Sequence, residues 1–171
     1  MDGKKTAIVM GATSGIGKEV ALLLAEKGWN LGISGRRTDK LEELKTSILS
    51  KNADGNDGCT NVSVAVIDIT SADAPQKLRN FIDELGGIDL YFHSSGIGFQ
   101  NVSLDFDKEL STVKTNSLGF TQMITTAFHY FAEHLERKGQ ISVISSIAGT
   151  KGLGSAPAYS ATKRFQRHYI E

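Results

Sequence analysis

Two kinds of hydrophobic pattern alternate along the chain. Short apolar or β-branched runs predict strands at residues 5–10, 31–34, 62–67, 88–93 and 140–145. Helix-forming segments between them predict helices at residues 15–27, 38–50, 71–85, 105–135 and from 157 to the end, with a polar loop at 51–61. Strands that alternate with helices are typical of an α/β fold. We therefore expect a doubly wound parallel sheet with helices on both faces.

Periodicity and capping residues give each early helix an expected face or start. In the first helix, apolar and aliphatic positions at helical spacing are Val20, Leu23, Leu24 and Lys27, and Gly28 is expected to end it. In the second helix, the expected buried face is Leu41, Leu44, Ile48 and Leu49, with a cap near Thr38 or Asp39. The third helix is expected to be capped near Ser71 or Asp73.

Composition limits the classes of protein that remain. A chain of 171 residues predicts a single domain over 1–171, and its formal net charge of zero gives no reason to expect nucleic acid or an anionic membrane as a partner. The one cysteine, Cys59, allows no internal disulfide and is interpreted as a bystander in a polar loop. No apolar run has the length of a signal peptide or membrane span, so we expect a cytoplasmic protein, and no metal site is predicted.

A glycine-rich turn joins the first strand to the first helix, and the rest of the fold is organised around it. Residues 10–17 have the sequence M-G-A-T-S-G-I-G. Gly11 allows a tight turn, whereas Gly15 and Gly17 let backbone and helix come close to a pyrophosphate. Because free N–H groups and the helix dipole face such an anion, a dinucleotide is the expected ligand. A bare glycine loop is also found in ordinary turns, so the remaining motifs decide.

Two arginines follow the second strand, at the place where an NAD-binding protein usually has an acidic residue. The sequence there is Gly35-Arg36-Arg37, and a guanidinium suits a 2′-phosphate. Ser14 of the glycine loop adds a hydroxyl donor. These residues favour NADP(H) over NAD(H), and the alternative is that the arginines are solvated turn residues, an alternative with more weight for Arg37 than for Arg36.

Tyr159 and Lys163 are spaced to lie one turn apart on the last helix, which Pro157 is expected to open. A free tyrosine, with a pKa of about 10, is a poor acid–base group near neutrality, and a nearby ammonium favours the phenolate. The pair is therefore a candidate for proton transfer. The Y-x-x-x-K pattern alone is common on helices, so it depends on the other motifs.

From the first strand to residue 171, this order of motifs resembles the short-chain dehydrogenases/reductases. Ser146 precedes Tyr159 at the family's spacing, and Asp68 and Asn116 also occur in order. The chain departs from the family at Met10, where Thr is usual, and at His93-Ser94-Ser95-Gly96, where N-N-A-G is usual. We interpret His93 as a replacement for an asparagine that ties adjacent strands, not as a catalytic base. The resemblance implies a Rossmann-like fold and a nicotinamide cofactor.

The resemblance also implies roles for particular residues. Tyr159 would exchange a proton with a carbonyl or alcohol oxygen, Ser146 would orient that oxygen, Lys163 would hold the nicotinamide ribose, and Asn116 would complete a water relay. The residues expected to contact the cofactor are Gly11, Thr13, Ser14, Gly15, Ile16, Gly17, Arg36, Arg37, Asp68, Ile69, Ser94, Gly96, Tyr159 and Lys163. Among them, Asp68 would meet the adenine amino group, and Ile69 would pack on the ring.

The resemblance further implies a sixth strand, a substrate-covering loop and helix, and a seventh strand beyond residue 171. We therefore expect a C-terminally truncated domain whose fifth strand is an exposed edge. The leading hypothesis is an NADP(H)-dependent oxidoreductase acting on a small carbonyl or alcohol substrate. The alternatives are a non-catalytic NADP(H)-binding module and a dimerisation module. A homo-oligomer is expected through apolar residues of the long helix: Phe120, Met123, Ile124, Ala127, Phe128 and Phe131. Leu153 and Ala156 are expected to line the substrate site, and the substrate itself is left open.

Overall fold

The computed structural model describes residues 4–52 and 61–171, and Cys59 lies outside them. In this part of the chain, the strands form one parallel five-stranded sheet with the order β3-β2-β1-β4-β5. The strands are β1 (Thr6–Met10), β2 (Asn30–Gly35), β3 (Val62–Val66), β4 (Leu90–His93) and β5 (Gln140–Val143). This arrangement confirms the predicted α/β fold.

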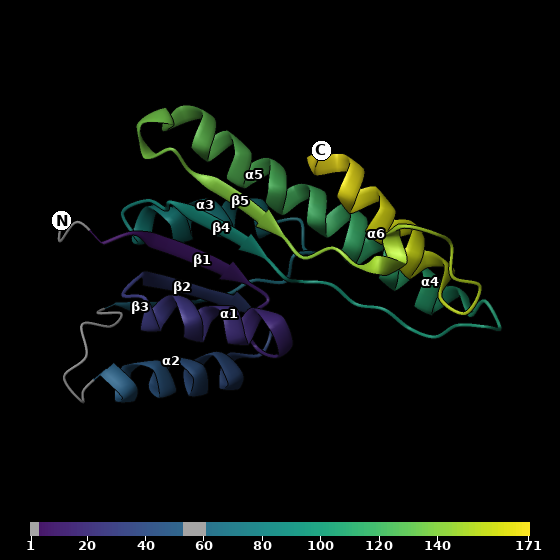
Figure 1. Ribbon diagram of the computed structural model, residues 1–171, viewed down its shortest axis with the longest axis horizontal. Helices are drawn as coiled ribbons and strands as arrows, with labels where there is room; N and C mark the ends of the chain where they lie inside the picture. Colours follow the sequence, from purple (N-terminus) through teal and green to yellow (C-terminus); the bar gives the residue numbers. More distant parts are fainter. Residues whose placement is uncertain (1–3, 53–60) are drawn as a thin grey trace.

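Helices connect the strands and cover both faces of the sheet, as Figure 1 shows. They are α1 (Gly15–Glu26), α2 (Thr38–Asn52), α3 (Ala74–Glu84), α4 (Phe106–Val113), α5 (Phe120–Glu133) and α6 (Pro157–Ile170). Shorter segments are the π-helical η1 (Lys114–Gly119) and the 3₁₀ turns η2 (Leu135–Arg137) and η3 (Ile147–Gly149). No helix among the described residues is both long and apolar enough to cross a membrane.

The central strand β1 is buried on both faces because its side chains alternate between two cores. Ile8 and Met10 belong to the core that α3 and α5 cover. Ala7 and Val9 belong to the opposite core, against α1 and α2. Burial on both faces explains why this strand is a continuous apolar run with no polar alternation.

The first two helices correct part of the sequence prediction. In α1 the buried stripe consists of the small residues Gly17, Ala21 and Ala25, whereas Leu23 is 55% exposed. Small side chains let the helix axis come close to the sheet, and Val20 and Leu24 pack partly buried beside this stripe against the same core. In α2, Leu41, Leu44 and Ile48 are buried as predicted, but Leu49 is 38% exposed.

The third helix begins later than predicted. Its N-cap is Asp73, whose side chain makes no capping hydrogen bond within the helix. The Asp73 carboxylate instead accepts from the Ser71 hydroxyl. Residues 71–73 therefore form a turn before α3, and Pro75 lies in the first turn of the helix, where its missing N–H costs nothing.

The long helical stretch predicted at 105–135 is divided in the middle. Helix α4 continues into the π-helical segment η1, which contains Asn116 and leads into α5. A π-helical turn inserts extra backbone into the helix and leaves carbonyls without their usual helical partners. Asn116 therefore lies at an irregularity in the helical stretch.

β5 is the last strand of the described sheet, as predicted. On α5, Phe120, Met123, Ile124 and Ala127 are buried in the core, whereas Phe128 is 60% exposed. Most of the apolar surface expected to mediate association is thus core packing. Formation of a homo-oligomer stays a prediction.

Candidate functional site

A cleft of about 970 Å³ lies at the carboxyl ends of the strands, and it collects most of the predicted residues. Those that line it are Gly11, Thr13, Ser14, Gly15, Ile16, Arg36, Arg37, Asp68, Ile69, Ser94, Gly96, Ser146, Tyr159 and Lys163. Leu153 and Ala156 line it too. Gly17 and Asn116 are not in its wall; they are buried behind it. One cavity therefore joins the residues predicted for cofactor and for catalysis.

The glycine loop is held by its backbone against β2. The main-chain N–H groups of Gly11 and Ala12 both donate to the Ser34 carbonyl, at 2.8 and 3.0 Å. Gly11 has φ +91°, and a Cβ there would lie 2.7 Å from the Ser95 nitrogen. Gly17 faces the Gly11 carbonyl so closely that a Cβ would clash with it. Both glycines are thus required by space, and Gly11 is also required by its backbone conformation.

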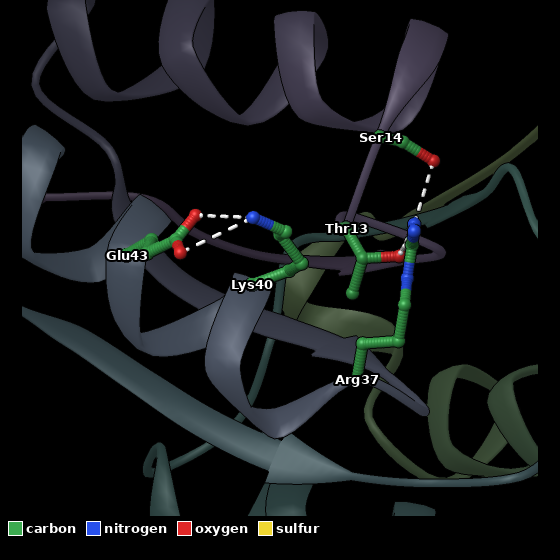
Figure 2. Close-up of polar contacts among 5 residues, drawn as sticks. All are labelled: Thr13, Ser14, Arg37, Lys40 and Glu43. Atoms are coloured by element: carbon green, nitrogen blue, oxygen red, sulfur yellow. Dashed lines mark hydrogen bonds and ion pairs between the residues drawn. The ribbon is translucent and has the colours of Figure 1, made fainter.

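Arg37 binds the glycine loop directly, as Figure 2 shows. Its Nη2 donates to the hydroxyl of Thr13 at 2.7 Å and to that of Ser14 at 2.9 Å. Ser14 is the N-cap of α1, but its side chain makes no capping bond. The first N–H groups of α1 consequently stay available to an anion, beside a guanidinium and two hydroxyls.

The other contacts in Figure 2 are local to α2. Lys40 forms an ion pair with Glu43, three residues further along the helix, at 2.8 Å. Both side chains are largely exposed, so the pair contributes little stability. Arg37 lies about one helical turn before Lys40 and binds the glycine loop instead.

Asp68 follows β3, and its side chain binds Thr70, two residues further along the chain. Its Oδ1 accepts from the main-chain N–H of Thr70 at 2.9 Å and from the Thr70 hydroxyl at 2.8 Å. Burial raises the pKa of Asp68, but the bonds from Thr70 and the charges of Arg36 and Lys114 outweigh burial and hold it below its usual value. The residue is therefore an ionised acceptor in the cleft wall, and it does not cap α3.

His93 ends β4, and its side chain does not tie adjacent strands as expected. Its Nδ1 lies 3.1 Å from the hydroxyl of Tyr91 on the same strand. The ring packs edge-on against Phe120 of α5 at 5.3 Å. The side chain points toward the helices, and the backbone of His93 pairs with Met10 of β1 and Val143 of β5. Its carbonyl also accepts from the Ile144 N–H.

The environment of His93 keeps its imidazole neutral. Burial, and then the charge of Lys163, lower its pKa to about 3. Nε2 has no hydrogen-bond partner among the described residues. A neutral ring fits this position because an imidazolium would be buried close to a second cation.

The candidate catalytic side chains come from η3 and α6. The Ser146 hydroxyl accepts from the main-chain N–H of Ala148 at 3.1 Å, which fixes its orientation and leaves its own hydrogen for another acceptor. The Tyr159 ring packs against Gly98, where a Cβ would collide with it. Lys163 lies one helical turn from Tyr159, and its Nζ is 6.0 Å from the centre of the tyrosine ring.

Lys163 is nearly buried, with 6% of its surface exposed. Its Nζ donates to the Ile144 carbonyl at 2.8 Å and to Gln166 Oε1 at 2.9 Å. Burial lowers the pKa of Lys163 below its ordinary value. The two acceptors stabilise the ammonium, which therefore lies at the cleft wall in a fixed place.

Asn116 connects η1 to the loop after β4. Its side chain accepts from the Ile97 N–H at 2.9 Å and donates to the Ile97 carbonyl at 2.7 Å. Its Nδ2 also lies 3.1 Å from the Thr162 hydroxyl of α6. The Asn116 side chain is thus fully engaged in holding the wall of the cleft.

Two further side chains hold this site although they belong to none of the predicted motifs. Glu109 accepts from the main-chain N–H of Ala158 at the start of α6, at 3.1 Å. Gln166 contacts both Lys163 and the main chain of Asn116. The contacts of Glu109 with Ala158 and of Gln166 with Asn116 join residues about fifty positions apart, so no local pattern reveals them. The only sequence signal was a polar glutamine on the face of α6 that also carries Lys163.

Comparison with known proteins gives the family. The family model described as short chain dehydrogenase matches residues 5–171. An uncharacterised oxidoreductase of Myxococcus xanthus is 30% identical over 98% of this chain, and one of Listeria monocytogenes is 33% identical over 98%. The chain belongs to the short-chain dehydrogenase family. It spans 64% of the length of the Myxococcus protein and 65% of the Listeria protein.

Solved structures agree with the fold. A short-chain dehydrogenase/reductase from Mycobacterium ulcerans has a TM-score of 0.85 and 26% identity, covering 97% of this chain and 60% of that one. An alcohol dehydrogenase from Thermococcus sibiricus, solved with 5-hydroxy-NADP, has a TM-score of 0.85 and 20% identity, covering 98% of this chain and 68% of that one. The predicted Rossmann-like architecture is confirmed.

Proposed function

We propose that this chain forms the cofactor-binding and catalytic part of an NADP(H)-dependent oxidoreductase that interconverts a carbonyl group and a secondary alcohol. One observation carries the proposal. A single cleft is lined by the glycine loop and two arginines together with Ser146, Tyr159 and Lys163. Family membership over residues 5–171 supports the same activity.

The residues present fit a dinucleotide with a 2′-phosphate. The start of α1 offers main-chain N–H groups to a pyrophosphate, beside glycines that no side chain could replace without a clash or strain. Arg37 with the hydroxyls of Thr13 and Ser14 offers donors to the 2′-phosphate, and Arg36 lines the same cleft. The ionised Asp68 is an acceptor for the adenine amino group. These features favour NADP(H) over NAD(H).

The bound nicotinamide would supply or accept the hydride. Tyr159 would donate a proton to the carbonyl oxygen in reduction, or take it from the alcohol in oxidation. The hydroxyl of Ser146, free to donate, would orient that oxygen. Lys163 would hold the nicotinamide ribose and favour the tyrosine phenolate by its charge. Asn116 would keep the adjoining wall in place.

Tyr159→Phe tests this assignment. We expect the purified chain to oxidise NADPH when a small carbonyl substrate is present. In the variant this rate should fall by a factor of about 10²–10⁴, while the affinity for NADPH stays the same. Equal rates in both proteins would contradict the role of Tyr159. If the chain binds NADPH but reduces none of a set of carbonyl compounds, the proposed oxidoreductase activity is contradicted. A non-catalytic NADP(H)-binding module is then favoured.

A further inference from the structure

Gln166 lies between Lys163 and the π-helical segment η1. It is 1% exposed, and both ends of its amide have partners. Its Oε1 accepts from Lys163 Nζ at 2.9 Å, and its Nε2 donates to the Asn116 carbonyl at 2.8 Å. One buried amide thus connects the ammonium of α6 to the main chain of another helix.

The chemistry of the two partners allows only one orientation of this amide. An ammonium can only donate, and a carbonyl can only accept. A flipped amide would place its NH₂ against the ammonium of Lys163 and its oxygen against the Asn116 carbonyl. Gln166 therefore acts as an acceptor toward Lys163 and as a donor toward Asn116.

We propose that Gln166 is a positioning residue that fixes the ammonium of Lys163 against the Asn116 carbonyl. The inference rests on the proposed function, in which Lys163 serves the cofactor and Tyr159. Of the three N–H groups of Lys163, two point to Ile144 and Gln166, which leaves the third for the cleft that Lys163 lines. Gln166 thus determines which way the ammonium faces.

Asn116 belongs to the π-helical segment η1. Its carbonyl nevertheless accepts from Gln166, a partner on another helix. The Asn116 side chain meanwhile binds Ile97 through both of its polar atoms. A continuous set of bonds therefore runs from Lys163 through Gln166 and Asn116 to the loop after β4. A water relay through the Asn116 carbonyl would have to share that oxygen with Gln166.

The groups that face the Lys163 ammonium in the described part of the chain are mostly uncharged, so the hydrogen bond to the Gln166 amide has a large share in stabilising its charge. The Tyr159 ring faces it from α6, and the neutral His93 faces it from β4. Asn116 and Gln166, which approach from η1 and α6, are uncharged. Burial lowers the pKa of Lys163. The Gln166 oxygen acts in the opposite sense, because it accepts a hydrogen bond from the charged form.

The test is an NMR titration of Lys163 in the full 171-residue chain without added cofactor. The chain carries ¹³C-labelled lysine, and Lys163→Arg assigns the signal. Gln166→Leu should lower the pKa of Lys163 by about one unit, and Gln166→Glu should raise it above the wild-type value. Thr126→Val is the matched control, because Thr126 is a buried polar residue whose hydroxyl donates to the Gln122 carbonyl within α5.

An unchanged Lys163 pKa in both Gln166 variants would overturn the proposal. If Gln166→Leu fails to fold by circular dichroism, Gln166→Glu, which keeps the size of the side chain, decides alone. NADPH titrations run in parallel and separate the two claims. Gln166→Leu should weaken NADPH binding about tenfold, which corresponds to the loss of one hydrogen bond to a charged group. A wild-type chain that binds no NADPH would reject the proposed function, while the lysine titration would still decide the role of Gln166.

Discussion

The carboxylate of Glu109 on α4 binds the main-chain N–H of Ala158, the second residue of α6, and so caps that helix. Its Oε2 accepts from the main-chain N–H of Ala158 at 3.1 Å, and its Oε1 accepts from Asn101 Nδ2 at 2.7 Å. Asn101, 2% exposed, is bound in turn to the main chain of Asp105 just before α4. An acid at the start of α6 also interacts favourably with the helix dipole. Glu109 therefore joins α4 to the helix that carries Tyr159 and Lys163.

Glu109→Ala should lower the free energy of unfolding by about 1–2 kcal/mol, because the cap is lost and the buried Asn101 amide loses an acceptor. Urea denaturation followed by circular dichroism measures the change. Glu42→Ala on the exposed side of α2 is the control, with an expected effect within about 0.5 kcal/mol. Equal midpoints for Glu109→Ala and the wild type would show that the contact does not hold α6.

A methyl group at Gly11 should damage both stability and binding. With φ +91°, and with a Cβ 2.7 Å from the Ser95 nitrogen, alanine would be strained and crowded at once. We expect Gly11→Ala to lower the free energy of unfolding by about 2 kcal/mol or more, and to weaken NADPH binding. Gly152→Ala is the matched control, since a Cβ there meets nothing within 4 Å. A thermal melt of both variants compares them, and similar melting temperatures would contradict the geometry of the loop.

Stability should decline with acid through His93. In the unfolded chain an imidazole takes up a proton below about pH 6.5, whereas burial and the charge of Lys163 lower the pKa of His93 to about 3 in the fold. The unfolded state therefore binds more protons between these values. His93 should make the free energy of unfolding fall by about 1.4 kcal/mol per pH unit as the pH drops from 6.5 toward 3.

His93→Asn should remove that part of the pH dependence, whatever its effect on stability at pH 7. Chemical denaturation at several pH values measures the slope for the variant and the wild type. His129→Gln, at an exposed position of α5, should keep the wild-type slope. A His93→Asn protein with an unchanged slope would mean that the buried ring is already protonated in the fold.

The two arginines should contribute differently to cofactor choice. Arg37 contacts Thr13 and Ser14 of the glycine loop, so Arg37→Leu should loosen the loop and weaken the binding of both cofactors, with the greater loss for NADPH. Arg36→Leu should affect the 2′-phosphate selectively, with about a tenfold loss for NADPH and little change for NADH. Isothermal titration of each variant with both cofactors measures this. Equal losses for both cofactors in Arg36→Leu would argue for the solvated-turn interpretation of that residue.

Local sequence patterns were sufficient for most of the fold. The apolar run at Ala7–Met10 and the glycines that follow it define a strand, a turn and a helix within a few residues. Tyr159 and Lys163 were predictable in the same way, because their relation is one helical turn. The order of the strands, β3-β2-β1-β4-β5, was not predicted, because the alternation of strands and helices alone does not determine which strands are neighbours.

The errors arise where tertiary packing overrides the local pattern. Leu23 lies at helical spacing with Val20 and Leu24, but it is 55% exposed because the small residues of α1 form the face that approaches the sheet. The side chain of His93 turns toward Phe120, which no spacing along β4 indicates. The contact of Gln166 with Asn116 spans 50 positions and depends on a π-helical segment. Sequence periodicity carries no information on such pairs.

The central claim is that this cleft binds NADP(H). The most direct measurement is a fluorescence titration of the purified 171-residue chain with NADPH, with NADH in parallel. We expect saturable binding of both, with NADPH about tenfold tighter, as a charge-assisted contact to the 2′-phosphate requires. Equal affinities for NADPH and NADH would contradict the proposal that Arg36 and Arg37 bind the 2′-phosphate. Saturable binding of neither cofactor would contradict the account of the cleft as a dinucleotide site.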